Sequence, residues 1–137
     1  NSIQTAKASN VPANCVAKAV VLEDRYHALM AVLPASRRLE LRELRASDGP
    51  DLHLATEADL KGLFIDCEPG AVPPVGSVYG LETIWDDSLM EQPEVYFEAG
   101  DHETLVRMKT RDFIVLMKGA RHMAFSAQMD EERRPLF

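Results

Sequence analysis

The apolar residues of this chain fall into short blocks separated by polar turns, which is the pattern of brief strands and helices. The blocks 15–22 and 26–33 flank the polar group 23–25 and predict a β-hairpin, which Pro34 ends. The segment 37–45 mixes strand and helix patterns. Further strands are expected over 52–55, 81–85, 94–99, 104–108 and 122–126.

Capping residues mark where helices begin. Thr56, followed by acidic residues, predicts one helix, and Asp86 predicts a short helical turn. Thr110 predicts a third helix, which Gly119 closes. Hairpins dominate and strands do not alternate regularly with helices. The pattern therefore predicts an α+β (mixed α/β) fold, a curved, largely antiparallel sheet of about six to seven strands with short helices around it.

Lys18 is the only charged residue in the first apolar block. Because strand side chains alternate between faces, Lys18 shares a face with Val16, Val20 and Leu22. Both faces of the block are apolar, so both are expected to be covered. A bare ammonium in an apolar layer costs several kcal/mol. The side chain must therefore reach a cleft, a partner or a ligand, or else snorkel at a sheet edge.

Length and composition exclude some classes of protein. The 137 residues suit one domain, 1–137, in which 127–137 is a charged tail. Apolar stretches fall short of the roughly 20 residues that span a bilayer, and the sequence shows no secretory signal. We therefore expect a cytoplasmic protein with no membrane partner. Because residue 1 is Asn, we also expect that the natural N-terminus lies further upstream.

The net charge of −7 argues against a general nucleic-acid coat and against DNA as a partner, because phosphate binding needs a basic surface. It is compatible with a local basic pocket that grips one end of an RNA. Two basic clusters, within 37–45 and 109–121, are interpreted mainly as solvated surface.

Familiar catalytic and metal-binding patterns are missing from the sequence. Cys15 and Cys67 form neither a disulfide framework nor a zinc site, so reduced thiols are expected. The four histidines lack ligand spacing, so no metal is expected. Ser77 lacks the glycines two positions before and after it that mark a nucleophile elbow.

A glycine- and proline-rich loop over 66–80 is the second feature with chemical content. Its candidate site residues are Gly70, Ala71, Val72, Pro73, Pro74 and Gly76. The two prolines stiffen the backbone, and the two glycines let it turn or approach a ligand closely. The N–H groups of 70–72 could hold a carbonyl oxygen or a developing oxyanion. A rigid structural turn explains the same residues.

Four segments of the chain resemble the YbaK/EbsC-type aminoacyl-tRNA deacylase family, which includes the editing domain inserted into bacterial prolyl-tRNA synthetases. They are Ala17-Lys18, Asp66-Cys67-Glu68-Pro69-Gly70-Ala71-Val72-Pro73-Pro74-Val75-Gly76, Asp87-Ser88-Leu89 and Phe97-Glu98-Ala99-Gly100. Their order and spacing match the family over nearly the whole chain.

The resemblance implies hydrolysis of an amino acid wrongly esterified to the 3′ end of a tRNA, without a metal or a cofactor. Lys18 matches the strand lysine associated with activity in the family, and the stretch from Gly70 to Pro74 matches the loop that lines the aminoacyl pocket. His102 is the candidate for a histidine that contributes in some members, with an exposed polar turn residue as the alternative. The implied partners are the acceptor end of a mischarged tRNA and an aminoacyl-tRNA synthetase.

One position departs from the family pattern. Members that act on alanyl-tRNA tend to have Asn after the lysine, and members that act on cysteinyl-tRNA tend to have Thr. This chain has Ala19 at that position, which leaves open the amino acid that is removed.

The mechanism that we predict needs positioning more than a strong nucleophile. Lys18 anchors the terminal phosphate or the ester, and the loop N–H groups hold the carbonyl. Val20, Met30 and the proline corner limit the pocket to small side chains. Two alternatives stay open: a non-catalytic module that binds aminoacyl-tRNA or a synthetase, and a hydrolase of another small ester.

Overall fold

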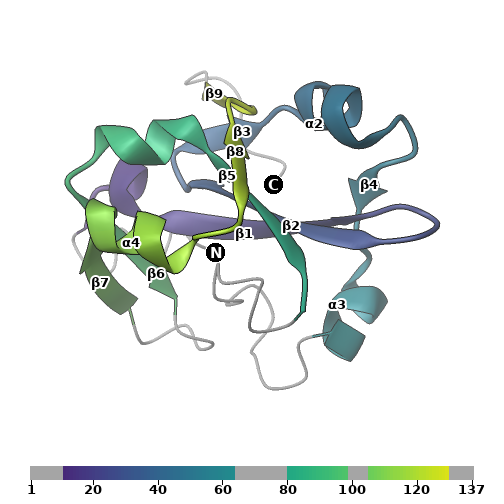
Figure 1. The fold of residues 1–137 in the computed structure, drawn as a ribbon, viewed down its shortest axis with the longest axis horizontal. Helices are drawn as coiled ribbons and strands as arrows, with labels where there is room; N and C mark the ends of the chain where they lie inside the picture. Colours follow the sequence, from purple (N-terminus) through teal and green to yellow (C-terminus); the bar gives the residue numbers. More distant parts are fainter. Residues whose placement is uncertain (1–10, 64–79, 99–104, 130–137) are drawn as a thin grey trace.

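The computed structural model describes residues 11–63, 80–98 and 105–129 of the chain. Its centre is a five-stranded sheet in the order β4-β1-β2-β5-β8 (Figure 1). The strands of this sheet are β1 (Ala17–Glu23), β2 (Ala28–Pro34), β4 (His53–Leu54), β5 (Glu82–Asp86) and β8 (Arg121–Met123). Two strand pairs accompany it: β3 (Arg37–Leu39) with β9 (Ser126–Gln128), and β6 (Glu94–Glu98) with β7 (Leu105–Lys109).

The predicted hairpin is confirmed as the antiparallel pair β1–β2. Lys18 pairs with Leu33 in its register. Strand β1 begins two residues later than predicted, because Cys15 belongs to the 3-10 turn η1 (Ala13–Cys15). The carboxylate of Asp24 accepts hydrogen bonds from two backbone N–H groups of the hairpin turn, which stabilises the chain reversal.

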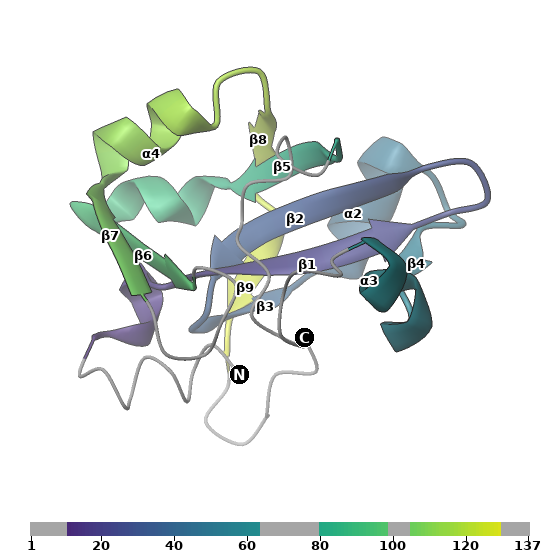
Figure 2. The ribbon, with the colours of Figure 1, turned by 90° about the horizontal axis from the view of Figure 1, so that it is seen from below.

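The predicted α+β fold with a largely antiparallel sheet is confirmed. Of the six strand pairings among the described residues, four are antiparallel. The pairs β2–β5 and β5–β8 are parallel (Figure 2). A parallel pair needs a crossover connection, and the chain between β2 and β5 contains two helices.

Helices occupy the connections between strands, and two predicted helix starts are confirmed. The hydroxyl of Thr56 accepts a bond from the N–H of Asp59, and the carboxylate of Asp86 accepts one from the N–H of Ser88. None of the helices in the described ranges is long and apolar enough to cross a bilayer. The helical elements after η1 are α2 (Leu41–Asp48), α3 (Glu57–Leu63), η3 (Asp87–Glu91) and α4 (Thr110–Leu116).

The predicted cap at Thr110 is wrong. Lys109 is the residue that precedes α4, and Thr110 is already helical. The Thr110 hydroxyl donates to the carbonyl oxygen of Gln92, so it ties the start of α4 to the segment after η3. Gly119, with φ of 92°, follows the helix as predicted.

In two segments the observed strands and helices differ from those predicted. The mixed segment 37–45 contains both predicted structures, because β3 is followed at once by α2. The single strand expected over 122–126 is replaced by β8 and β9, which belong to different strand pairings.

Apolar layers cover both faces of the β1–β2 hairpin, as predicted. The lower layer joins Met30 and Val32 to residues of η3, β6 and α4. The upper layer joins Leu29, Ala31 and Leu33 to residues of α2 and β3. In Figure 1, α2 and β3 lie above the hairpin and β6 and β7 lie below it, whereas η3, which packs in the lower layer, is drawn above the hairpin in this view. In Figure 2, which is seen from below, α2 accordingly lies behind the sheet.

Candidate functional site

Lys18 lies near the start of β1, on the face that the upper layer covers. Strand alternation places Val20 and Leu22 on the same face, and Leu33, its partner across the hairpin, is fully buried. The lysine side chain is partly exposed. Lys18 therefore carries a cationic group at the edge of an otherwise apolar layer.

Burial lowers the pKa of Lys18 from 10.5 to about 8. The cause is desolvation, which disfavours the charged form of an amine. The ammonium remains the main form at neutral pH, and an anion or a polarised carbonyl would interact with it strongly because little water screens it. Shifts of this kind are typical of functional groups in clefts.

Val20 and Met30, which we expected to line one pocket, lie on opposite faces of the hairpin. Val20 packs against the upper layer, on the side of Lys18, whereas Met30 is fully buried in the lower layer. The hairpin register is the reason, because Met30 pairs with Val21 and directly paired residues share a face. The structure therefore corrects the grouping, and only Val20 lies near Lys18.

The remaining predicted site residues lie outside the described residues. They are Gly70, Ala71, Val72, Pro73, Pro74, Gly76 and His102. Their roles in holding the substrate stay predictions.

A buried polar network around Asp86 was not foreseen beyond its capping role. Asp86 is 2% exposed, and its carboxylate accepts hydrogen bonds from the Phe125 N–H and the Ser126 hydroxyl, each at 2.8 Å. The Ser126 hydroxyl in turn accepts a bond from Nε of Arg37 at 2.6 Å. These bonds join β5, β9 and β3. Because the residues are far apart in the chain, no sequence spacing could have revealed the network.

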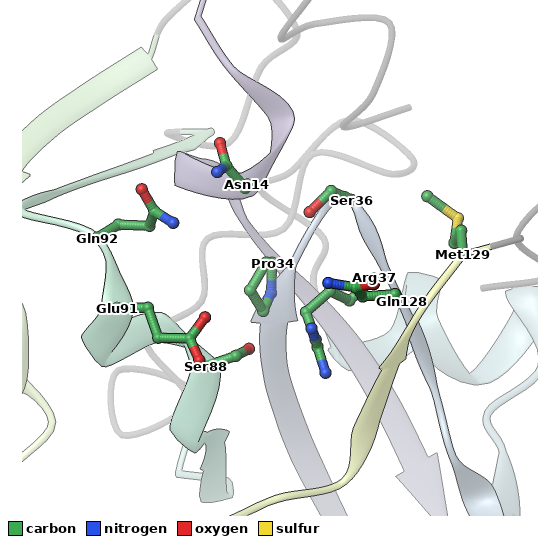
Figure 3. A pocket seen from close by; sticks show the side chains of 9 residues that line it. All are labelled: Asn14, Pro34, Ser36, Arg37, Ser88, Glu91, Gln92, Gln128 and Met129. Carbon is green, nitrogen blue, oxygen red and sulfur yellow. The ribbon is translucent and has the colours of Figure 1, made fainter. Parts of the chain in front are cut away.

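A cavity of about 320 Å³ opens at the end of β2, beside this network (Figure 3). Its size lies near the lower limit of small-molecule sites, roughly 300–1,000 Å³. Most of its lining side chains are polar, and they include one cation, Arg37, and one anion, Glu91. The lining residues are Asn14, Pro34, Ser36, Arg37, Ser88, Glu91, Gln92, Gln128 and Met129.

The other potentially reactive side chains, Cys15 and His122, have surroundings that give them a structural role. Cys15 is a free thiol whose pKa is raised by burial and by the charge of Glu94, so its nucleophilic thiolate form is disfavoured. His122 bonds to Asp87 through Nδ1 at 2.6 Å and stacks on the ring of Trp85. Across the ranges that the structure describes, no group of three His, Cys, Asp or Glu residues could hold a metal ion.

Comparison with known families decides what kind of domain this is. Residues 1–116 match the family model of the aminoacyl-tRNA editing domain. The chain belongs to this family. The match confirms the resemblance drawn from Lys18 and the proline-rich loop. No curated protein matches this editing domain.

Solved structures share the fold of the editing domain. A protein described as a proposed trans-editing enzyme for prolyl tRNA synthetase aligns with a TM-score of 0.81 and 24% identity, over 93% of this chain and 80% of its own. The hypothetical protein APE2540 aligns with a TM-score of 0.81 and 21% identity, over 93% and 84% of the two chains. A scaffold protein from a computational epitope-grafting study aligns with a TM-score of 0.81 and 22% identity, over 94% of this chain and 82% of its own. At these identities the likeness shows the fold.

Proposed function

We propose that this editing domain is a trans-editing hydrolase that deacylates mischarged tRNA. One observation carries the proposal: a desolvated lysine, with a pKa lowered to about 8, lies at the edge of an apolar layer in a member of an editing family. Such a group suits a substrate that is both anionic and polarised. The 3′ end of an aminoacyl-tRNA has both properties.

The reaction breaks the ester bond between the carbonyl carbon of the amino acid and a ribose oxygen. Water adds to the carbonyl carbon, the carbonyl oxygen takes up negative charge, and the ribose oxygen leaves with a proton. An aminoacyl ester is already activated, so positioning and charge stabilisation can supply the several kcal/mol that are needed. No cofactor is required for these steps.

Each predicted residue has a part in this scheme. The ammonium of Lys18 anchors the terminal phosphate or the ester by charge. The N–H groups of Gly70, Ala71 and Val72 would hold the carbonyl oxygen as its charge develops. His102 is the candidate for a second contributing side chain.

Selectivity for small amino acids would come from the walls of the acyl pocket. Val20 lies on the face of Lys18, and Pro73, Pro74 and Gly76 would form the facing corner. One methylene is worth only about 1–3 kcal/mol of discrimination. A pocket that selects by size alone would therefore also accept amino acids only slightly larger than the preferred one, and contacts with the tRNA itself must add selectivity.

The decisive experiment is a panel of mischarged tRNAs incubated with the protein at catalytic concentration. We expect release of a small amino acid from at least one tRNA by the wild type, and its abolition by Lys18→Ala. Lys118→Ala, which removes an exposed lysine beyond α4, is the matched control and should leave the rate unchanged. Near-normal hydrolysis of every tRNA by Lys18→Ala would remove the role assigned to Lys18.

A second function is favoured by the net charge of −7, which weakens affinity for RNA. The domain would then bind an aminoacyl end or a synthetase without turnover, or act with a synthetase that supplies RNA affinity. The same panel separates these outcomes, because binding of tRNA without release of an amino acid indicates a non-catalytic binding module. Turnover of model esters with indifference to tRNA would indicate a hydrolase of small esters.

A further inference from the structure

The cavity at the end of β2 has the chemistry of a nucleotide site that the proposed mechanism does not use. Its lining offers side-chain amides from Asn14, Gln92 and Gln128, which can donate and accept hydrogen bonds at the edge of a base. Glu91 adds a carboxylate, which accepts hydrogen bonds from an exocyclic amino group such as that of cytosine.

Arg37 supplies a cation held in a fixed position. Its Nε donates to the Ser126 hydroxyl at 2.6 Å, and one Nη donates to the Ser126 carbonyl oxygen at 3.0 Å. Ser126 is itself held by the buried carboxylate of Asp86 at 2.8 Å. These two bonds use two of the five N–H groups of a guanidinium, and among the described residues Arg37 makes no others. The remaining donors suit a phosphate.

The cavity lies within one residue step of Lys18 along the hairpin. Pro34 pairs with Ala17, and the next pair is Lys18 with Leu33. Strands rise about 3.3 Å per residue, so the backbone of this end of β2 is one step from Lys18, although Pro34, paired with Ala17, lies on the opposite face of the hairpin. Strand β3, which provides Arg37, also contributes Leu39 to the upper layer, on the face of Lys18.

The opposite walls of the cavity differ in chemistry. Figure 3 shows Gln92, Glu91 and Ser88 on one side of Pro34, with Ser36, Arg37 and Gln128 on the other. An acceptor-rich wall therefore faces a wall that carries the cation. A nucleotide presents the same division, with its base edge at one end and its phosphate at the other.

We propose that this cavity binds the unpaired cytidine next to the terminal adenosine of a tRNA, with its phosphate on Arg37 and its amino group on Glu91. The inference rests on the proposed function, because it places the aminoacylated adenosine at Lys18. It explains how an acidic domain holds an RNA end: a single fixed guanidinium takes one phosphate, and a carboxylate reads the base.

The test uses the full chain and unacylated trinucleotides, with binding followed by NMR titration at fixed salt. We expect 5′-CCA-3′ to bind about tenfold more tightly than 5′-CUA-3′, because uracil offers an acceptor where cytosine offers its amino group. Glu91→Gln should reduce that preference to less than about twofold. Arg37→Gln should weaken both trinucleotides about tenfold, as expected for the loss of a charged hydrogen bond.

Matched controls come from exposed residues of α2. Glu43→Gln and Arg42→Gln make the same charge changes away from the cavity and should alter neither affinity nor preference. Equal effects of Arg42→Gln and Arg37→Gln would indicate unspecific charge attraction and overturn the proposal. The proposal would also be overturned if the wild type did not prefer 5′-CCA-3′ over 5′-CUA-3′, or if Glu91→Gln kept that preference. Glu91 is exposed, so Glu91→Gln should fold and can still test the proposal if Arg37→Gln does not fold.

Failure of this inference and failure of the proposed function give different results, because the trinucleotides carry no ester. Hydrolysis that depends on Lys18, with no cytidine preference, would overturn the cavity proposal alone. A preference that depends on Glu91, with no hydrolysis of any mischarged tRNA, would support the cavity and overturn deacylation.

Discussion

The two faces of the β1–β2 hairpin are built from alternating residues of the same strands, yet they have different chemistry. The lower face contributes Ala17, Val21 and Met30 to a core that continues into α4. The upper face carries Lys18 at one end and continues into the layer under α2 and β3. Strand alternation alone separates a purely structural face from one that presents a cation.

This comparison shows where a charge can be held at the edge of a layer that is otherwise apolar. Both faces contribute buried apolar side chains, among them Met30 on the lower face and Leu33, the partner of Lys18, on the upper face. Lys18 lies near the start of β1, where desolvation lowers its pKa to about 8 but the side chain is still partly exposed. Stability and function should therefore respond to different substitutions.

The largest expected effect is on stability, at Met30. Met30→Ala removes a fully buried side chain of the lower layer and should cost about 2–5 kcal/mol of unfolding free energy in urea titrations. The rate of deacylation per folded molecule and the preference among amino acids should not change. A changed preference would mean that the lower face contributes to the acyl pocket after all.

The opposite outcome is expected at Lys18. Lys18→Met keeps the length of the side chain and removes its charge, so deacylation should fall at least about 100-fold, or about 2.7 kcal/mol. The free energy of unfolding should not fall below that of the wild type, because the desolvation cost disappears with the charge. Lys118→Met is the control for both measurements, and a large loss of stability in Lys18→Met would contradict the division between faces.

A pH profile tests the protonated form of Lys18. Its pKa is lowered to about 8, so the active ammonium is lost as the pH rises through that value. After subtraction of the hydrolysis that occurs without protein, the rate should be about tenfold lower one pH unit above the pKa. The stability effect has the opposite sign. Between about 8 and 10.5 the unfolded chain holds more protons than the folded one, so the contribution of Lys18 to stability rises with pH in that window.

Below that window the desolvation cost is present in full. Any stability advantage of Lys18→Met should therefore be largest at neutral pH and shrink towards pH 10. A rate that stays level past pH 10 would show that the ammonium of Lys18 is not needed.

The smallest expected effect is on selectivity, at Val20. Val20→Ala enlarges the space beside Lys18 and should shift the relative rates for small and larger amino acids several-fold, or about 1 kcal/mol. Val21, on the other face, offers a matched control, and Val21→Ala should leave the ratio unchanged. Equal shifts in both variants would assign the change to altered strand stability instead.

The sequence by itself determined the local features of this protein. The apolar block around Lys18 predicts a strand covered on both faces, the caps at Thr56 and Asp86 predict helical turns, and the loop motif indicates the editing family. These features depend on neighbouring residues in the chain, so periodicity and side-chain chemistry are enough to find them.

Only the tertiary structure decided which distant residues meet. The hairpin register placed Met30 on the face opposite Lys18, and the Thr110 hydroxyl bonds to Gln92 instead of capping its helix. The Arg37–Ser126–Asp86 network and the cavity beside it join strands that are far apart in the chain. The physical reason is that register and long-range hydrogen bonds are set by the packing of whole layers, which a pattern of neighbouring residues does not encode.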